Sequence, residues 1–175
     1  SLGGMSAMHA QINGLDYIHH INQPHWFAEG GDDSPDDFGI RVARELEAKI
    51  DELGQDNVAA FIAEPIQGAG GVIIPPDSYW PEIKRICQER DILLVMDEVI
   101  CGFGRTGEWF AVNHWGVVPD VMTMAKGLTS AYVPMGAVGV RRAIADQFTD
   151  RVFASGLTYN SHPLACAAAL ATIGV

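Results

Sequence analysis

Residues 92–107 read ILLVMDEVICGFGRTG and decide the fold class of this 175-residue chain. The apolar run at 92–96 is too short for a helix and is bounded by charged residues, which predicts a strand buried on both faces of a parallel sheet. Asp97 and Glu98 then stand at the carboxyl end of that strand, where open α/β sheets bind their ligands. The stretch therefore predicts a ligand site as well as a strand.

The turn after these carboxylates also matches the G-x-G-x-x-G pattern of dinucleotide-binding proteins, at residues 102–107. That fingerprint requires glycines that open a helix, because the helix N-terminus binds the pyrophosphate. Here Asp97 and Glu98 precede the glycines and would repel a pyrophosphate, and residues 108–116 lack the pattern of an amphipathic helix. We therefore reject a dinucleotide site at this turn.

The composition, with 48% hydrophobic and 19% charged residues, is typical of a globular protein with a substantial core. The net charge of −11 argues against nucleic acid and anionic membranes as partners, since both need a basic surface. The sequence has no apolar stretch of about 18 residues and no signal-peptide pattern, so we expect neither a membrane span nor export. The expected location is cytoplasmic.

The cysteines do not suggest a disulfide framework. Cys87, Cys101 and Cys166 are odd in number, widely spaced and set among apolar residues, so reduced thiols are expected. The six histidines have no cysteine or carboxylate partners at ligand spacing, so no metal site is predicted.

Hydrophobic periodicity predicts an alternation of helices and strands. Apolar residues at three- and four-residue steps indicate a helix that ends near Gly54, and a second helix with Pro81 in its first turn runs from about residue 78 to 90. The remaining expected elements are strands at 58–63, 92–96, 121–125 and 137–140, helices at 143–148 and 163–175, and a strand or extended connector at 18–27. Such alternation predicts a parallel or mixed α/β sheet with helices on both faces.

Two more of these strands end in residues that can carry chemistry. Glu64 follows the strand at 58–63, and Lys126 follows the strand at 121–125. A surface lysine at a strand end would also account for Lys126, and a structural turn would account for the glycine-rich segment that follows Glu64. Neither residue therefore assigns a function by itself.

Four motifs together resemble the class III pyridoxal-phosphate-dependent aminotransferases, in order and in separation. They are Glu64–Gly68, Asp97–Gly107, Ala125–Leu128 with Pro134–Ala137, and Thr158–Pro163. The resemblance implies the fold of the PLP-dependent transferases (aspartate aminotransferase-like), with residues 1–175 as part of the PLP-binding large domain. It also implies that an N-terminal portion and a C-terminal small domain are absent from this sequence, and that the protein is a homodimer.

The resemblance assigns roles to four residues. Lys126 would hold pyridoxal 5'-phosphate through a Schiff base and move the proton during the reaction, because only a primary amine can do both. Asp97 would keep the pyridine nitrogen protonated, Val99 would lie against the ring face, and Thr158 would donate to the cofactor phosphate of the neighbouring subunit. Simpler alternatives are helix caps for Asp97 and Thr158 and an ordinary sheet residue for Val99.

Three positions depart from the family pattern. Ile100 stands where many members have a Gln that binds the phenolic oxygen of the cofactor, and Ser161 replaces a common Gly. Ala69 replaces a Glu that, in members that use 2-oxoglutarate, masks an active-site Arg of the small domain. An unmasked, buried Arg would be costly, so the resemblance favours a mobile Arg and pyruvate as the acceptor.

We therefore expect transamination from an amine or omega-amino acid to a keto acid, with pyruvate as the favoured acceptor. The alternatives are another PLP enzyme of the same family, namely a 2-oxoglutarate-dependent omega-aminotransferase, an aminomutase or a decarboxylase. A non-catalytic truncated fragment is the third possibility, because part of the cofactor site would be missing.

Overall fold

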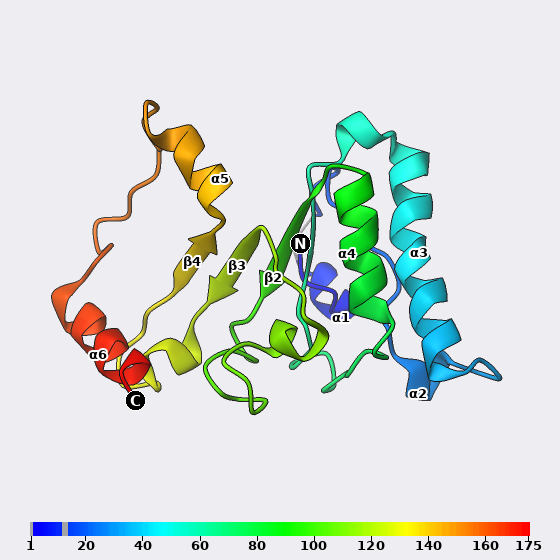
Figure 1. The fold of residues 1–175 in the computed structure, drawn as a ribbon, viewed down its shortest axis with the longest axis horizontal. Coiled ribbons are helices and arrows are strands. Elements are labelled where there is room, and N and C mark those ends of the chain that lie inside the picture. Colours follow the sequence, from blue (N-terminus) through cyan, green and yellow to red (C-terminus); the bar gives the residue numbers. More distant parts are fainter. Residues whose placement is uncertain (1, 12–13) are drawn as a thin grey trace. The chain divides into compact units, whose positions relative to one another are not determined.

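The computed structural model describes residues 2–11 and 14–175. It divides the chain into unit 1, Ser1–Ala59 with Ile66–Asp91, and unit 2, Ala60–Pro65 with Ile92–Val175. Unit 1 is helical, and unit 2 contains the sheet (Figure 1). No helix in the described ranges is long and apolar enough to cross a membrane.

Unit 1 is built around two helices, α3 and α4. Ser34 caps α3 by accepting the N–H of Asp37 at 3.2 Å, and Pro35 occupies the first turn, where its missing N–H costs nothing. The other elements of this unit are short. The bounds are α1 Ser6–His9, α2 Trp26–Glu29, α3 Pro35–Leu53, η1 Gln55–Asn57 and α4 Tyr79–Glu89.

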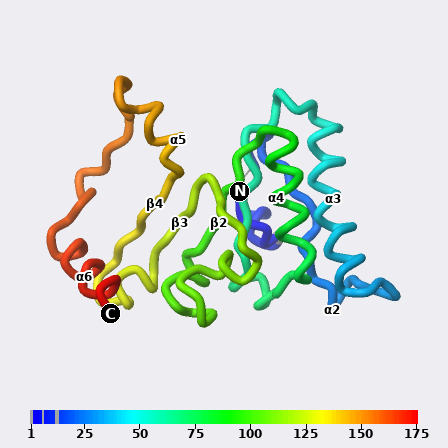
Figure 2. Tube along the Cα trace, in the orientation of Figure 1, coloured from blue at the N-terminus to red at the C-terminus, as the bar shows by residue number. Residues whose placement is uncertain are grey.

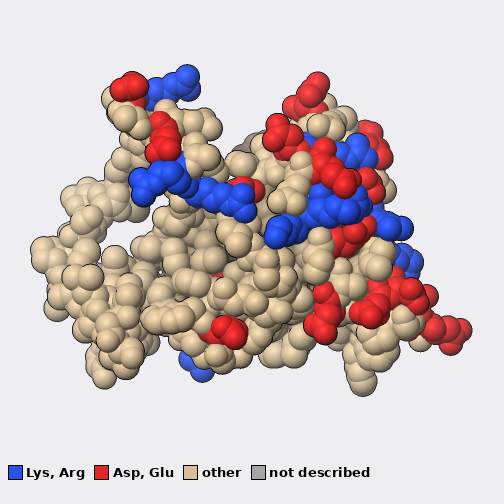
Figure 3. All heavy atoms as spheres, in the orientation of Figure 1, with Lys and Arg blue, Asp and Glu red and all other residues tan. Residues whose placement is uncertain are grey.

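The core of unit 1 lies between α3 and α4, which pack against each other. Apolar residues spaced at three and four positions place one face of each helix toward the other, as the periodicity predicts. The buried side chains are Phe38, Val42, Ala43, Leu46 and Ile50 of α3 and Tyr79, Trp80, Ile83, Ile86 and Cys87 of α4. The charged residues of unit 1 gather over the same two helices in Figure 3.

Unit 2 contains a mixed sheet in the order β1-β2-β3-β4. The first three strands are parallel and β4 runs antiparallel to β3. Figure 2 traces β2, β3 and β4 side by side. The bounds in this unit are β1 Ala60–Ala63, β2 Leu93–Asp97, η2 Ala111–Trp115, β3 Val121–Met124, η3 Lys126–Thr129, β4 Ala137–Val140, α5 Arg142–Ala145, η4 Asp146–Phe148 and α6 Pro163–Ile173.

Asp120 fixes the register of β2, β3 and β4 at the end of the sheet where β3 begins. Its carboxylate accepts the N–H of Leu94 at 2.9 Å, and its own N–H donates to the Leu94 carbonyl at 2.9 Å. Its carbonyl accepts the N–H of Arg141, whose guanidinium lies 3.3 Å from the Asp120 carboxylate. One residue therefore joins the chain segments that begin β2 and β3 to the end of β4.

The structure confirms the predicted mixed α/β class and corrects two details. Leu94 and Met96 are buried, but Leu93 is 41% exposed, so the prediction that this strand is buried on both faces is wrong for the chain as described. Because side chains alternate across a strand, Leu93 and Val95 share the less covered face. The strand alternative for residues 18–27 is also wrong: most of the segment is irregular, and Trp26 begins α2.

Candidate active site

Asp97 is the last residue of β2, as the sequence predicts. It is half-buried, and its Oδ1 accepts the N–H of Val99 at 3.0 Å. This short-range bond turns the chain away from the sheet and holds the carboxylate in one orientation. Val99 is half-buried directly beside it. The structure therefore brings Asp97 and Val99 together.

Lys126 lies at the same edge of the sheet, two residues after the neighbouring strand β3 ends. Asp97 pairs with Thr123 in the parallel β2–β3 register, and Lys126 follows Thr123 by three residues. The carboxyl ends of adjacent parallel strands thus deliver a carboxylate and an amine to one edge. Glu64 directly follows β1, in which Ala63 pairs with Met96, so it reaches that edge as well.

The backbone of Lys126 is unusual for a lysine. Its φ is +40°, in the left-handed region that side chains with a Cβ rarely adopt. The residue is exposed, and within the described part of the chain its amine makes no ion pair or hydrogen bond. A lysine held in a strained conformation without a partner is available for chemistry, and such strain is concentrated at functional sites.

The turn after Asp97 lies directly against the residue that follows Lys126. A Cβ added at Gly127 would lie 3.0 Å from the Cβ of Phe103 and 3.2 Å from the carbonyl oxygen of Gly102. Glycine at 127 therefore allows an approach that a larger residue would obstruct. The 102–107 turn does not open a helix, since η2 begins only at Ala111, which agrees with the rejection of a dinucleotide site.

Glu98 is fully buried, although in the sequence it stands out only as a carboxylate next to Asp97. Its Oε1 accepts the N–H of Val112 at 2.9 Å, whereas its Oε2 is buried with no hydrogen-bond partner in the described ranges. Burial raises the pKa of Glu98, and the charge of Asp97 adds to the rise. The backbone N–H groups of Val112 and Ala111 and the nearby His114 oppose it.

Thr123 is a second residue that sequence analysis missed. Its Oγ1 is buried and has no hydrogen-bond partner among the described residues. Because paired residues of adjacent strands project to the same face of a sheet, Thr123 shares a face with Asp97. A hydroxyl in a strand gives no signal in the sequence, since its significance depends on the pairing.

Thr158 is the fourth residue to which the resemblance assigns a role. It lies in an exposed turn shortly before α6, and no described residue hydrogen-bonds to its hydroxyl. Ser161, in the same turn, has a left-handed φ of +56°. Unit 2 thus brings Asp97, Val99 and Lys126 to one edge of the sheet, and no hydrogen bond among the described residues joins the Thr158 side chain to them.

The donor set at this edge fits pyridoxal phosphate. A half-buried carboxylate can pair with a protonated pyridine nitrogen, and an amine without a partner can bind an aldehyde. The unpartnered hydroxyl of Thr123, on the face of Asp97, leaves a further donor for a polar ligand.

Comparison with known proteins gives consistent matches over nearly the whole chain. A family model described as "Aminotransferase class-III" matches residues 4–175. The putrescine–pyruvate aminotransferase of Pseudomonas aeruginosa is 57% identical over 177 residues, a match that covers 100% of this chain. The chain spans 39% of the length of that relative.

Two solved structures share the fold. An (S)-enantioselective omega-transaminase from Thermomicrobium roseum has a TM-score of 0.85 and 48% identity, over 89% of this chain and 35% of that chain. An amine transaminase from an uncultivated Pseudomonas species, solved in a PLP-bound form, has a TM-score of 0.93 and 41% identity, over 99% of this chain and 41% of that chain.

Proposed function

Because this chain belongs to the class-III aminotransferase family, we propose that the full-length protein moves an amino group from an amine or omega-amino acid to a keto acid. The cofactor of the family is pyridoxal 5'-phosphate. The observation that carries the proposal is the delivery of Asp97 and Lys126 to one edge of the sheet by neighbouring parallel strands. The cofactor supplies a ring that accepts the electron pair left when a proton leaves the substrate.

Lys126 would hold the cofactor covalently through Nζ and, once a substrate amine had displaced it, would serve as the general base. Its free amine would take the proton from the substrate carbon that bears the amino group and would return that proton to the carbon at the other end of the same C–N bond. The absence of an ion pair on Lys126 within the described residues supports this role, because an ion pair favours a charged ammonium and only a neutral amine can act as a base.

Asp97 binds the pyridine nitrogen and keeps it protonated. The N–H of Val99 orients the carboxylate toward this task by occupying Oδ1. Val99 offers the ring an unreactive apolar contact. Neither residue changes its covalent bonds in the reaction.

Thr158 donates to the cofactor phosphate of a partner subunit, and the active protein is a homodimer. Two observations support this part of the proposal: Thr158 is exposed, and its hydroxyl has no partner in the described part of the chain. Residues 1–175 form part of the PLP-binding large domain, with an N-terminal portion and a small domain supplied by the rest of the protein. The share of its relatives' length that the chain spans is consistent with this.

Pyruvate is the preferred acceptor. The Pseudomonas aeruginosa relative is named for pyruvate, and Ala69 provides no carboxylate to mask an arginine. A clear preference for 2-oxoglutarate in kcat/KM, measured with one amine donor, would refute this choice while leaving transamination intact. The proposed location is cytoplasmic, in keeping with a cysteine spacing that does not suggest a disulfide framework.

The experiment that tests the function compares Lys126→Ala with Lys49→Ala in the full-length protein. Lys49 lies within the helix α3 and pairs with Glu52. Lys126→Ala is expected to lose both the borohydride-reducible link to the cofactor and turnover, whereas Lys49→Ala retains both. A borohydride-reducible adduct at wild-type stoichiometry in Lys126→Ala would refute the assignment of Lys126 as the residue that binds the cofactor. The absorbance of bound PLP in the wild type distinguishes an enzyme that binds its cofactor from an inactive fragment. Identification of the products distinguishes transamination from decarboxylation or amino migration.

A further inference from the structure

Glu98 connects three segments around the candidate active site. Its backbone N–H donates to the carbonyl of Thr123 on β3 at 2.9 Å, and its carbonyl accepts the N–H of Gly102 at 2.9 Å. Its side chain reaches Val112, fourteen residues further on, at 2.9 Å. The first two bonds fix the start of the turn, and the third fixes the far end of the 99–110 loop.

The bond to Val112 meets a need of η2. Val112 is the second residue of that helix, so its N–H has no acceptor within the helix. The Phe110 N–H is served instead by the Asn113 side chain at 3.0 Å. Without Glu98, the buried Val112 N–H would lack an acceptor, which is costly in the interior.

A chain of contacts leads from this bond to Lys126. Phe110 stands two residues before Val112, and its ring packs edge-on against Phe103 with centroids 5.4 Å apart. Phe103 and Gly102 in turn lie against Gly127. Gly127 is the residue next to Lys126, so a shift of η2 would change the position of the lysine.

We propose that Glu98 is a positioning residue of the enzyme. Its hydrogen bond from the Val112 N–H, called the clasp below, holds the Gly102–Phe103 turn against Gly127 and so fixes the position of Lys126 relative to Asp97. The inference rests on the proposed function, since Lys126 and Asp97 matter together only if both hold the cofactor. What the clasp requires of residue 98 is an acceptor oxygen that is separated from Cα by three carbon atoms, Cβ, Cγ and Cδ. It does not require a negative charge.

The test uses the full-length protein and four substitutions. Glu98→Gln keeps the acceptor oxygen, Glu98→Met keeps the length without an acceptor, and Glu98→Asp keeps the carboxylate but is one methylene shorter. Glu108→Met is the matched control, because Glu108 is an exposed carboxylate on the same loop. The readouts are hydrogen exchange of the Val112 amide in the apoprotein, the Kd for pyridoxal phosphate, and the pH midpoint of the absorbance of the bound cofactor.

Glu98→Met and Glu98→Asp are expected to speed exchange at Val112 and to weaken cofactor binding, each by about tenfold, as the loss of one hydrogen bond to a buried donor predicts. Both are expected to move the pH midpoint of the bound cofactor, because it reports the placement of Lys126. Glu98→Gln should restore all three readouts to within about threefold of the wild type, and Glu108→Met should leave them unchanged.

Wild-type cofactor affinity in Glu98→Met or Glu98→Asp would overturn the proposal, and so would a Glu98→Gln variant as impaired as Glu98→Met. If only Glu98→Gln folds, residue 98 serves folding alone and the proposal is likewise overturned. Failure of the proposed function is recognised separately. In that case the wild type forms no borohydride-reducible adduct, while exchange at Val112 in the apoprotein still reports whether the clasp exists.

Discussion

Lys126 and Ser161 of unit 2 both occupy the left-handed backbone region, but for different reasons. Lys126 and Ser161 have φ values of +40° and +56°, and each pays about 1–2 kcal/mol relative to glycine for the contact between its Cβ and the backbone. At Lys126 the side chain is indispensable to the proposed chemistry, so the strain accompanies function. Ser161 has no comparable role, and a glycine is common there in the family that the sequence resembles.

Ser161→Gly is therefore expected to stabilise the protein by about 0.5–1 kcal/mol, less than the full strain because glycine also gains freedom in the unfolded chain. The measurement is the free energy of unfolding from denaturant titration of the full-length protein. Ser155→Gly, at a position without a left-handed φ, is the control and should destabilise slightly. A stability loss in Ser161→Gly would mean that the serine side chain makes a contact worth more than the strain.

Gly127, next to Lys126, is a second position where the size of one side chain affects the candidate site. Gly127→Val would force a branched side chain into the space held by Phe103 and Gly102, and should cost about 1–3 kcal/mol and weaken cofactor binding. Gly136→Ala is the control, since its Cβ would meet only the Met124 carbonyl at an ordinary 3.5 Å. Calorimetry and PLP titration check both effects, and unaltered cofactor binding in Gly127→Val would show that the turn can retreat without consequence.

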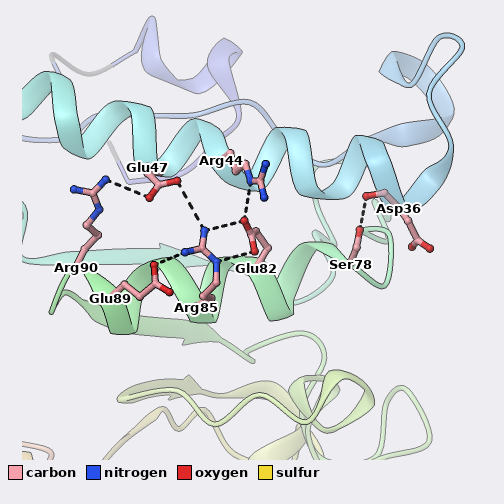
Figure 4. A network of polar contacts seen from close by, with 8 residues as sticks. All are labelled: Asp36, Arg44, Glu47, Ser78, Glu82, Arg85, Glu89 and Arg90. Carbon is pink, nitrogen blue, oxygen red and sulfur yellow. Dashed lines mark hydrogen bonds and ion pairs between the residues drawn. The ribbon is translucent and has the colours of Figure 1, made fainter.

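At the scale of elements, a network of charged side chains joins α3 to α4 (Figure 4). Glu82 is its centre: Arg85 donates to both carboxylate oxygens at 2.8 and 2.9 Å, and Arg44 donates to one at 2.9 Å. The Glu82 side chain is only 13% exposed, so these pairs are less screened than ordinary surface pairs. Arg90 extends the network through Glu47 and Asp51.

The network makes unit 1 sensitive to acid. The hydrogen bond from Arg85, followed by that from Arg44, lowers the pKa of Glu82 from 4.5 to about 2 despite its burial. A lowered folded-state pKa means that the stabilisation is fully present above about pH 4.5 and is lost as the pH falls through about 2.

Glu82→Gln is accordingly expected to destabilise unit 1 by about 1–2 kcal/mol at neutral pH and by progressively less below pH 4.5. The measurement is the free energy of unfolding of both proteins from pH 7 to pH 2, and the difference between them isolates residue 82. Asp56→Asn, which removes an exposed carboxylate with no ion pair in the described ranges, is the control. A difference that stayed constant with pH would contradict the assigned cause.

At the scale of the whole molecule, the proposed dimer places Thr158 in the cofactor site of the other subunit. The prediction is tested with two inactive parents, Lys126→Ala and Thr158→Val, and the hybrid dimers formed on mixing them. In a hybrid, one site has Lys126 from the Thr158→Val subunit and Thr158 from the Lys126→Ala subunit, and is complete.

Hybrid dimers should therefore regain up to half of the wild-type sites with normal affinity for pyridoxal phosphate, as measured by cofactor titration of the purified hybrid. Each parent variant, taken alone through the same mixing procedure, is the control and should regain no sites of normal affinity. If Thr158 served its own subunit, no hybrid site would be complete, and the absence of recovery would reject the exchange. A fully active monomer would reject the dimer itself.

The sequence by itself determined the elements and the two residues at their ends. The spacing of Leu46 and Ile50 within α3, and the short apolar runs before Asp97 and Lys126, are local patterns, and the structure places each of these elements where the pattern predicts it. Local hydrophobic period and the chemistry of strand ends suffice for this, because they depend on neighbours in the chain.

Only the tertiary structure decided how those elements meet. The pairing of Asp97 with Thr123, the antiparallel direction of β4 and the bond from Val112 to Glu98 all join residues far apart in sequence. A register is set by hydrogen bonds between strands and by anchors such as Asp120, and no property of either strand alone specifies it. The burial of Glu98 was hidden for the same reason: a carboxylate after a strand is ordinarily solvated, and only its folded neighbours exclude the water.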